Sequence, residues 1–318
     1  MTVFVASNDV VAGGLHVARG GGATLVDAEP NLVALAQHPN RPVLYGLTET
    51  ELITWRVRGE SVERLATTAL LFGEEACAVA ATASSVVVAH YASGSITVYA
   101  LGGNGEPLAS TVVAFDGSGP DRDRQTASHP HHVLPMGQQF VVTDLGADRL
   151  WWVTDDGDVV HEVALPAGFG PRHTAQLPDG SLVSVGELAA DVAVISSPLS
   201  ASPSIDVMPS STVTSHARCY PSDLAITPEG LVVVANRGTD TVAVFVTGAD
   251  GLERSDEASS GGVWPLNLAL VERALYVADR DSDRVVRFGL DADQAVLTQQ
   301  ATFTVPSPTW VISVRPSS

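Results

Sequence analysis

Charged and imidazole side chains interrupt apolar stretches of this sequence at matching places. Those of most interest are Arg172 in GFGPRHTA, Glu187 in SLVSVGEL, Arg237 in VVVANRG, and His129 and His131 in SHPHH. Burying an unpaired charge is costly, so charged residues that recur where apolar stretches begin or end are candidates for a site rather than for the core. Because a guanidinium presents a planar fork of donors to carboxylate or phosphate, two arginines in one cavity predict an anionic ligand.

The histidines add the possibility of proton transfer, because histidine changes its charge near neutral pH. His129 and His131 alternate on an extended chain and should point the same way. No second His/Asp group with a recognisable metal spacing accompanies them, and Cys77 and Cys219 lie in no metal-binding or redox motif. We therefore predict an acid/base histidine, no metal and no cofactor.

Other catalytic mechanisms have recognisable sequence features, and the absence of such a feature argues against that mechanism. The sequence has no G-x-S-x-G motif, the turn that presents a nucleophilic serine, so water is the predicted nucleophile. All 17 basic residues are arginine, and the lack of lysine excludes Schiff-base enzymes and phosphate-binding P-loops. Glycosidase chemistry with paired carboxylates stays open, because it depends on a separation that a sequence does not contain.

The charge balance bears on possible partners. With 17 basic and 36 acidic residues, the net charge is −19, which would repel a nucleic-acid backbone. No run of about 18 apolar residues indicates a membrane span, and the first residues, MTVFVASNDV, do not resemble a signal peptide. We expect a cytoplasmic monomer or weak homodimer that binds a small anion and neither nucleic acid nor membrane.

The elements that must position these residues repeat along the chain. Six segments, each with the pattern of a strand, a tight turn and a second strand, begin at Leu32, Cys77, His132, His173, Ser222 and Leu266. Their starts lie 45, 55, 41, 49 and 44 residues apart. This spacing is typical of four-stranded propeller blades, whereas a sandwich or two stacked barrels would not repeat one hairpin so regularly.

A seventh, incomplete copy, TWVISVRP, begins at Thr309. Its missing partner strands can come from Thr2–Ala6 and the segments that follow, which would close the ring and remove exposed sheet edges. The sequence therefore predicts an all-β, seven-bladed β-propeller of four-stranded antiparallel blades. Residues 1–318 would form one domain, with the last blade shared by about residues 2–28 and 309–315.

This fold would bring the candidate residues together. In an antiparallel hairpin the start of the first strand and the end of the second lie at the same end, so one face should collect residues from both places. At the starts are His129, His131, His132, Arg172, His173 and Trp264, and at the ends are Glu49, His90, Asp144, Glu187, Arg237, Asp279 and Arg280. The alternative interpretation is that the arginines and carboxylates form ion pairs between blades.

The chain resembles the lactonase family of seven-bladed propellers, which contains bacterial 6-phosphogluconolactonases and fungal carboxy-cis,cis-muconate cyclases. The resemblance rests on GSGPDRDRQTASHPHH, VTDLGADRL, GFGPRH, PSDLAITPEGLVVVANRGTDTVAVF and GVWPLNLAL. It implies an active site of one histidine, two arginines and one glutamate. By motif these are Arg172 of GPRH, Glu187 at the next strand end, Arg237 of ANRG, and His131, with His129 as the second choice. We also expect His129, His90, Asp144 and Asn236 to bind substrate.

Two departures from the family pattern bear on the substrate. Where the family usually has Pro-Arg-Asn, this chain has Pro265, Leu266 and Asn267, and the usual asparagine before the tyrosine of the second unit is His90. Losing an arginine would weaken a phosphate site in particular. The resemblance thus implies a lactone hydrolase for a carboxylate- or phosphate-bearing lactone, with His131 or Glu187 as general base. A carboxymuconate cycloisomerase and a noncatalytic binding propeller are the alternatives.

Overall fold

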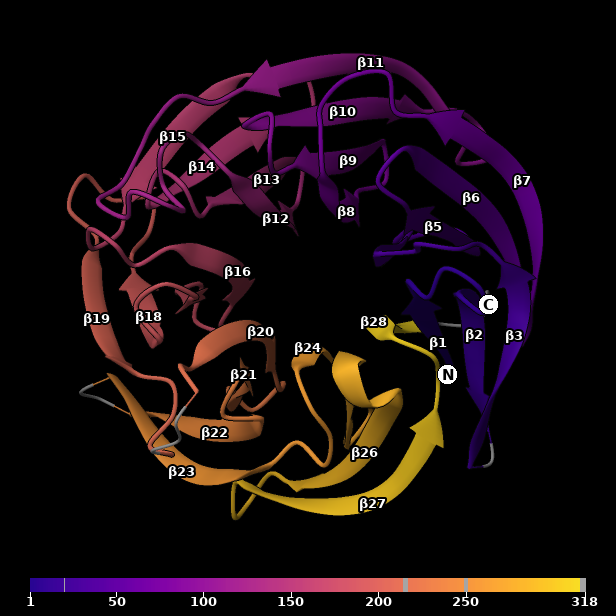
Figure 1. Ribbon diagram of the computed structural model, residues 1–318. Coiled ribbons are helices and arrows are strands. Elements are labelled where there is room, and N and C mark those ends of the chain that lie inside the picture. The colour runs from indigo at the N-terminus through magenta and orange to yellow at the C-terminus, as the bar shows by residue number, and fades with distance from the viewer. Residues whose placement is uncertain (20, 214–216, 249–250, 315–318) are drawn as a thin grey trace.

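The computed structural model describes residues 1–19, 21–213, 217–248 and 251–314. In these residues 28 strands form seven four-stranded antiparallel sheets, which stand around a central axis as the blades of a propeller (Figure 1). The predicted fold is confirmed. The described ranges contain one 3-10 turn, η1 (Arg280–Ser282), and no helix with the length and apolar content needed to cross a bilayer.

We number the blades along the chain and give their strands from the axis outward. Blade 1 contains β28 (Pro308–Val314), β1 (Thr2–Ser7), β2 (Gly14–Arg19) and β3 (Gly22–Ala28). Blade 2 contains β4 (Ala34–Gln37), β5 (Val43–Leu47), β6 (Glu51–Arg58) and β7 (Ser61–Ala69). Blade 3 contains β8 (Ala76–Ala81), β9 (Ser85–His90), β10 (Ser95–Leu101) and β11 (Pro107–Ala114). Blade 4 contains β12 (Pro130–Met136), β13 (Gln139–Asp144), β14 (Arg149–Thr154) and β15 (Val159–Ala164).

The other three blades have the same plan. Blade 5 contains β16 (Pro171–Gln176), β17 (Leu182–Gly186), β18 (Asp191–Ser196) and β19 (Ser204–Pro209). Blade 6 contains β20 (Tyr220–Ile226), β21 (Val232–Arg237), β22 (Thr241–Gly248) and β23 (Gly251–Ser259). Blade 7 contains β24 (Pro265–Val271), β25 (Ala274–Asp279), β26 (Arg284–Asp291) and β27 (Val296–Thr304).

The two ends of the chain close the ring within blade 1. Strand β28 pairs antiparallel with β1, with Phe4 opposite Ile312, and the two strands lie side by side in Figure 1. The predicted closure is confirmed, and β28 ends at Val314, so residue 315 of the predicted closing segment lies outside the described residues. Closure of this kind gives blade 1 its fourth strand, β28, which pairs with β1 on one side and faces the axis on the other.

The hydrophobic core consists of layers between neighbouring blades. Strands such as β9, which is buried along its whole length, contain Val and Ala in continuous runs because both of their faces pack against adjacent sheets. Between blades 4 and 5, for example, Val141 and Trp152 pack with Leu182 and Ala193. This packing around the axis holds the innermost strands at defined positions, and these strands carry most of the site.

The innermost strands share an irregularity at their first residues. In six blades the ladder register shifts by one residue there, which leaves a single bulged residue without an opposite partner. The bulged residues are Cys77, His131, Arg172, Ser222, Leu266 and Thr309. All but Cys77 follow a proline, which lacks an N–H for the ladder. A β-bulge redirects a side chain, and here it does so near the axis.

Candidate active site

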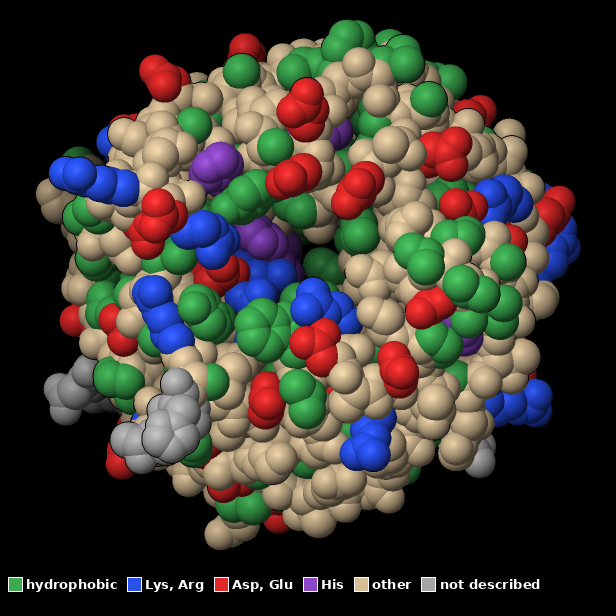
Figure 2. All heavy atoms as spheres, in the orientation of Figure 1, with side chains coloured by type: hydrophobic (Ala, Val, Ile, Leu, Met, Phe, Trp, Pro, Cys, Tyr) green, Lys and Arg blue, Asp and Glu red, His purple; other side chains and the backbone are tan. Residues whose placement is uncertain are grey.

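A cavity of about 620 Å³ opens where the innermost strands begin and the second strands end. Figure 2 shows the hollow at the centre of the ring, with blue arginines and purple histidines inside it. Five of the bulged residues line it, namely Cys77, His131, Arg172, Leu266 and Thr309. Residues at or just after the ends of the second strands also line it, including Asn8, Glu49, Tyr91, Glu187, Arg237 and Arg280. The cavity therefore draws residues from all parts of the ring.

Three arginines converge on the carboxylate of Glu187. Arg237 Nη2 lies 2.6 Å and Arg172 Nε 3.2 Å from Oε2, and Arg124 Nη2 lies 2.8 Å from Oε1. Burial alone would raise the pKa of Glu187, but the guanidinium groups of Arg237 and Arg172 outweigh it and hold this pKa well below its usual range. Glu187 is therefore a carboxylate across the physiological pH range.

The arginines are themselves fixed by the backbone and by aromatic rings. Arg172 Nη1 donates to the carbonyl oxygen of Ser222 in the next blade. Arg237 Nε donates to the Tyr220 carbonyl at 3.2 Å, and its guanidinium lies over the Trp264 ring at 5.4 Å. Burial, together with the charge of Arg237, lowers the pKa of Arg172 to about 10. Arg172 thus remains charged at neutral pH and is held in one orientation.

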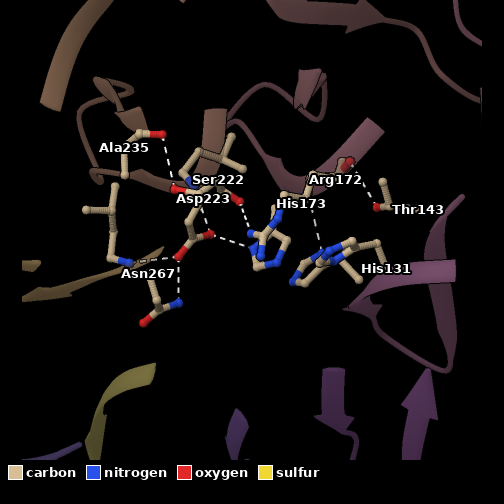
Figure 3. Close-up of polar contacts among 12 residues, drawn as sticks. His131, Thr143, Arg172, His173, Ser222, Asp223, Ala235 and Asn267 are labelled. Atoms are coloured by element: carbon tan, nitrogen blue, oxygen red, sulfur yellow. Dashed lines mark hydrogen bonds and ion pairs between the residues drawn. The ribbon is translucent and has the colours of Figure 1, made fainter. Parts of the chain in front are cut away.

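Two histidines line the same cavity, His131 of β12 and His173 of β16 (Figure 3). Their ring centroids lie 5.7 Å apart, and Tyr91 packs edge-on against His131 at 5.7 Å. Burial lowers the pKa of both imidazoles well below the usual value, and the charge of Arg172 acts in the same direction. Both rings are therefore neutral at pH 7.

A second layer of polar residues lies directly beyond the bulges and joins the blades (Figure 3). His173 Nδ1 lies 2.7 Å from Asp223 Oδ1, and Asn267 Nδ2 donates to Asp223 Oδ2 at 2.6 Å. The side-chain oxygen of Asn267 in turn accepts from the Val311 amide at 2.7 Å. The ring of His132 stacks on that of His173, with centroids 4.4 Å apart. Residues from blades 4 to 7 and blade 1 thus support one another beneath the cavity.

The structure brings the four residues predicted as catalytic together in the lining of the cavity, namely His131, Arg172, Glu187 and Arg237. His129, the second choice for the histidine, does not line it. The His129 ring stacks on Tyr91 with centroids 4.4 Å apart, and its Nδ1 lies 2.8 Å from the Tyr91 carbonyl oxygen. The structure therefore places His131 at the cavity and His129 behind a residue that lines it.

Three other predicted substrate-binding residues, His90, Asp144 and Asn236, are also absent from the cavity lining. Each pairs with the residue that precedes a bulge: Ala76 with His90, Pro130 with Asp144 and Pro221 with Asn236. Because side chains alternate along a strand, a shift of one residue exchanges the two faces. The next residues along the chain in two of these blades, Tyr91 and Arg237, line the cavity instead.

Hydrogen bonds show what these three residues do in the fold. His90 Nε2 lies 2.9 Å from the Thr97 hydroxyl. Asp144 accepts from the Trp151 indole at 3.0 Å, and Asn236 donates to the Ser210 carbonyl at 3.1 Å. All three stabilise the hairpin ends from inside the protein.

Sequence reasoning missed Arg124, Tyr91 and Asp223. Arg124 lies in the long segment between β11 and β12, and it also donates to the Tyr91 hydroxyl at 3.2 Å. Nothing in the spacing of that segment indicates which of its charges turns inward. Asp223, by contrast, follows a Pro-x pair, as do His132, His173 and Asn267. The repeated proline is the signal that could have aligned these positions.

Among the described residues no group of three His, Cys, Asp or Glu side chains is placed to hold a metal ion.

Known proteins resemble this chain in sequence and in fold. Residues 22–313 match the family described as "Lactonase, 7-bladed beta-propeller". A 6-phosphogluconolactonase of Bacillus subtilis is 27% identical over 314 residues, which are 89% of each chain. Two solved structures have TM-scores of 0.87: a Lactobacillus plantarum protein, 24% identical over 98% of this chain and 99% of that one, and the periplasmic gluconolactonase of Pseudomonas aeruginosa, 20% identical over 98% of both. At such identities the structural likeness concerns the fold alone. The chain belongs to the lactonase family of seven-bladed β-propellers.

Proposed function

We propose that this protein hydrolyses a lactone bearing a carboxylate or phosphate group. The observation that supports the proposal is the convergence of Arg124, Arg172 and Arg237 on the single carboxylate of Glu187. Three positive charges against one negative charge leave this side of the cavity positive, although the whole chain has a net charge of −19. A local field of this kind attracts and orients an anion.

Membership of the lactonase family and the name of the Bacillus subtilis relative support the same reaction class. Hydrolysis begins when water adds to the lactone carbonyl and negative charge develops on the carbonyl oxygen. Donors that are already fixed where this charge develops lower the barrier, because they need not reorganise during the reaction. Arg172 and Arg237, held by Ser222, Tyr220 and Glu187, provide such donors.

The attacking water must also lose a proton. Glu187 is poorly suited to accept it, because its three arginine partners stabilise the carboxylate and hold its pKa well below the usual range. The imidazoles of His131 and His173 line the cavity and are neutral, so each can offer a ring nitrogen to the proton, although burial lowers their pKa as well. The same imidazole can return the proton to the alkoxide that leaves when the ring opens.

The noncatalytic alternative predicts that the arginines pair between blades and that the charged face has no cavity. The arginines do pair between blades, since Arg237 of blade 6 contacts Glu187 of blade 5. A cavity of about 620 Å³ is nevertheless present, within the range of small-molecule sites. We therefore favour a catalytic site over a purely structural cluster.

The proposal is tested on a panel of sugar-acid and muconate lactones with and without a carboxylate or phosphate. Arg172→Ala should reduce kcat/KM on the preferred lactone about a hundredfold or more, whereas the exposed Arg58→Ala should leave it unchanged. Reaction in water enriched in oxygen-18 should place one heavy oxygen in the product carboxylate. Product without the heavy oxygen would indicate cycloisomerisation, and an inactive wild-type protein on the whole panel would contradict the proposal.

A further inference from the structure

One of the two cavity histidines has a carboxylate partner and the other does not. His173 Nδ1 lies 2.7 Å from Asp223 Oδ1. His131 has no hydrogen bond to its buried Nδ1 among the described residues. Catalytic histidines are characteristically oriented by a carboxylate on one ring nitrogen, which leaves the other nitrogen for the reaction.

Asp223 is placed to act only as a hydrogen-bond acceptor. Its Oδ2 accepts from Asn267 Nδ2 at 2.6 Å and from the Leu268 amide at 2.8 Å. Its Oδ1 accepts from the Leu224 amide at 2.8 Å, as well as contacting His173. Because these donors surround both oxygens, the shared proton lies on His173 Nδ1, and Nε2 keeps a free electron pair.

The ring of His173 is also fixed from both sides. It stacks on His132, with centroids 4.4 Å apart, and is tilted against Trp310 at 5.8 Å. His173 is also one of the residues that line the cavity. Arg172, its neighbour in the chain, lies in the same cavity with its guanidinium held by Ser222 and Glu187. The proton acceptor and an oxyanion donor therefore come from adjacent residues of one bulged strand.

We propose that His173, oriented by Asp223, is the group that moves the proton during lactone hydrolysis. The inference rests on the proposed function. As the water oxygen bonds to the lactone carbonyl carbon, one water proton passes to His173 Nε2. When the bond between that carbon and the ring oxygen breaks, the proton passes from Nε2 to the departing oxygen, which becomes a hydroxyl group. His173 ends as it began, and Asp223 is a positioning residue throughout.

Single and double variants test this assignment on the lactone that the wild-type protein hydrolyses fastest. His173→Asn should lower kcat at least a hundredfold with little change in KM, because it removes the proton acceptor. Asp223→Asn should lower kcat by a similar factor. The double variant should be no slower than His173→Asn alone, since Asp223 acts only through the imidazole. His161→Asn, outside the cavity, is the matched control and should keep wild-type activity.

Two readouts separate catalysis from mere damage to the fold. Added imidazole should restore part of the activity of His173→Ala, and it should not rescue Arg172→Ala. The acid limb of the kcat/KM pH profile should move to lower pH in Asp223→Asn, because the imidazolium loses its carboxylate. The other charged or titratable groups near His173 are Arg172, Arg237, His131 and His132, and they are unchanged in this variant.

The outcomes distinguish this inference from the proposed function. A hundredfold loss in His131→Asn together with a loss of less than tenfold in His173→Asn would overturn the assignment to His173 and leave lactone hydrolysis standing. An unmoved pH profile in Asp223→Asn would overturn the positioning role of Asp223. A wild-type protein that hydrolyses no lactone would overturn both proposals at once.

Discussion

The two sides of the cavity have the same backbone plan and opposite chemistry. Blades 4 to 6 form an arginine wall, which we define by His131, Arg172, Glu187 and Arg237. Blades 1 to 3 form an opposite wall, which we define by Val33, Glu49, Cys77 and Thr309. Bulged residues occur in both, for example Arg172 and Cys77. The repeated bulge supplies equivalent positions, and residue identity alone decides which of them can do chemistry.

The walls also differ in the burial and the ion pairing of their glutamates. Glu187 is buried and forms ion pairs with three arginines, whereas Glu49, near the corresponding end of β5, is exposed. An anion should therefore bind at the arginine wall, and the uncharged part of a lactone should lie toward the opposite wall.

The largest effect is expected for Glu187→Gln, which leaves three arginines close together without their carboxylate. Loss of one partner from a buried ion pair typically costs about 3–5 kcal/mol of the free energy of unfolding, measured by denaturant titration at pH 7. Because the pKa of Glu187 is lowered in the folded protein, its contribution is present above the ordinary pKa of a glutamate and is lost as the pH falls below it.

Glu49→Gln is the matched change on the opposite wall. Since this carboxylate is exposed, the free energy of unfolding should change by less than about 0.5 kcal/mol. Equal losses in the two variants would show that the walls do not differ in the way their charges indicate.

Blade 7 lies between the two walls and contains a buried carboxylate, Asp279, whose pKa is raised, whereas that of Glu187 is lowered. Burial raises the pKa of Asp279 to about 7, against the smaller opposing effect of the Ser260 hydroxyl. The unfolded chain releases this proton near pH 4, so Asp279 lowers stability as the pH rises from about 4 to about 7. Because the pKa rises from about 4 to about 7 on folding, Asp279→Asn should gain about 4 kcal/mol of stability over wild type between pH 4 and pH 8.

The measurement is the difference in free energy of unfolding between this variant and wild type, followed from pH 4 to pH 8. The difference should grow with pH and level off above about 7. A constant difference would mean that Asp279 does not titrate in this range.

A smaller effect is expected from extending the arginine wall into blade 7. Leu266 is the bulged residue there and lines the cavity. Leu266→Arg should lower KM for a phosphorylated lactone about tenfold, because a charge-assisted hydrogen bond to phosphate is worth about 1.5–3 kcal/mol before the cost of ordering the side chain. KM for the corresponding uncharged lactone should not fall, and an equal fall for both would argue against a role for charge.

The smallest effect is expected for Cys77→Ala, the bulged residue of blade 3. Burial raises the pKa of this thiol to about 12, so it is not a nucleophile at neutral pH. The activity on the preferred lactone should stay within about twofold of wild type, and the free energy of unfolding within about 1 kcal/mol. A large loss of activity would show that the opposite wall takes part in the reaction.

Sequence patterns predicted the propeller because each hairpin has a local signal, an apolar run, a turn and a second run, repeated at nearly constant intervals. They also indicated Arg172, Glu187 and Arg237, whose charges interrupt that pattern and which line the cavity. They placed His90, Asp144 and Asn236 at the correct end of the blades but on the other face of the strand, because a position is not precise to one residue until the register is known.

What the sequence by itself determined is therefore the repeat, the closed ring and the end of the ring where charged residues gather, since these depend on periodic patterns within short segments. Only the tertiary structure decided that Arg124 joins Glu187 and that Asp223 meets His173, 50 residues away in the chain. Those contacts link different blades, and their distances depend on how the blades pack around the axis and on where each strand bulges, which no local pattern specifies.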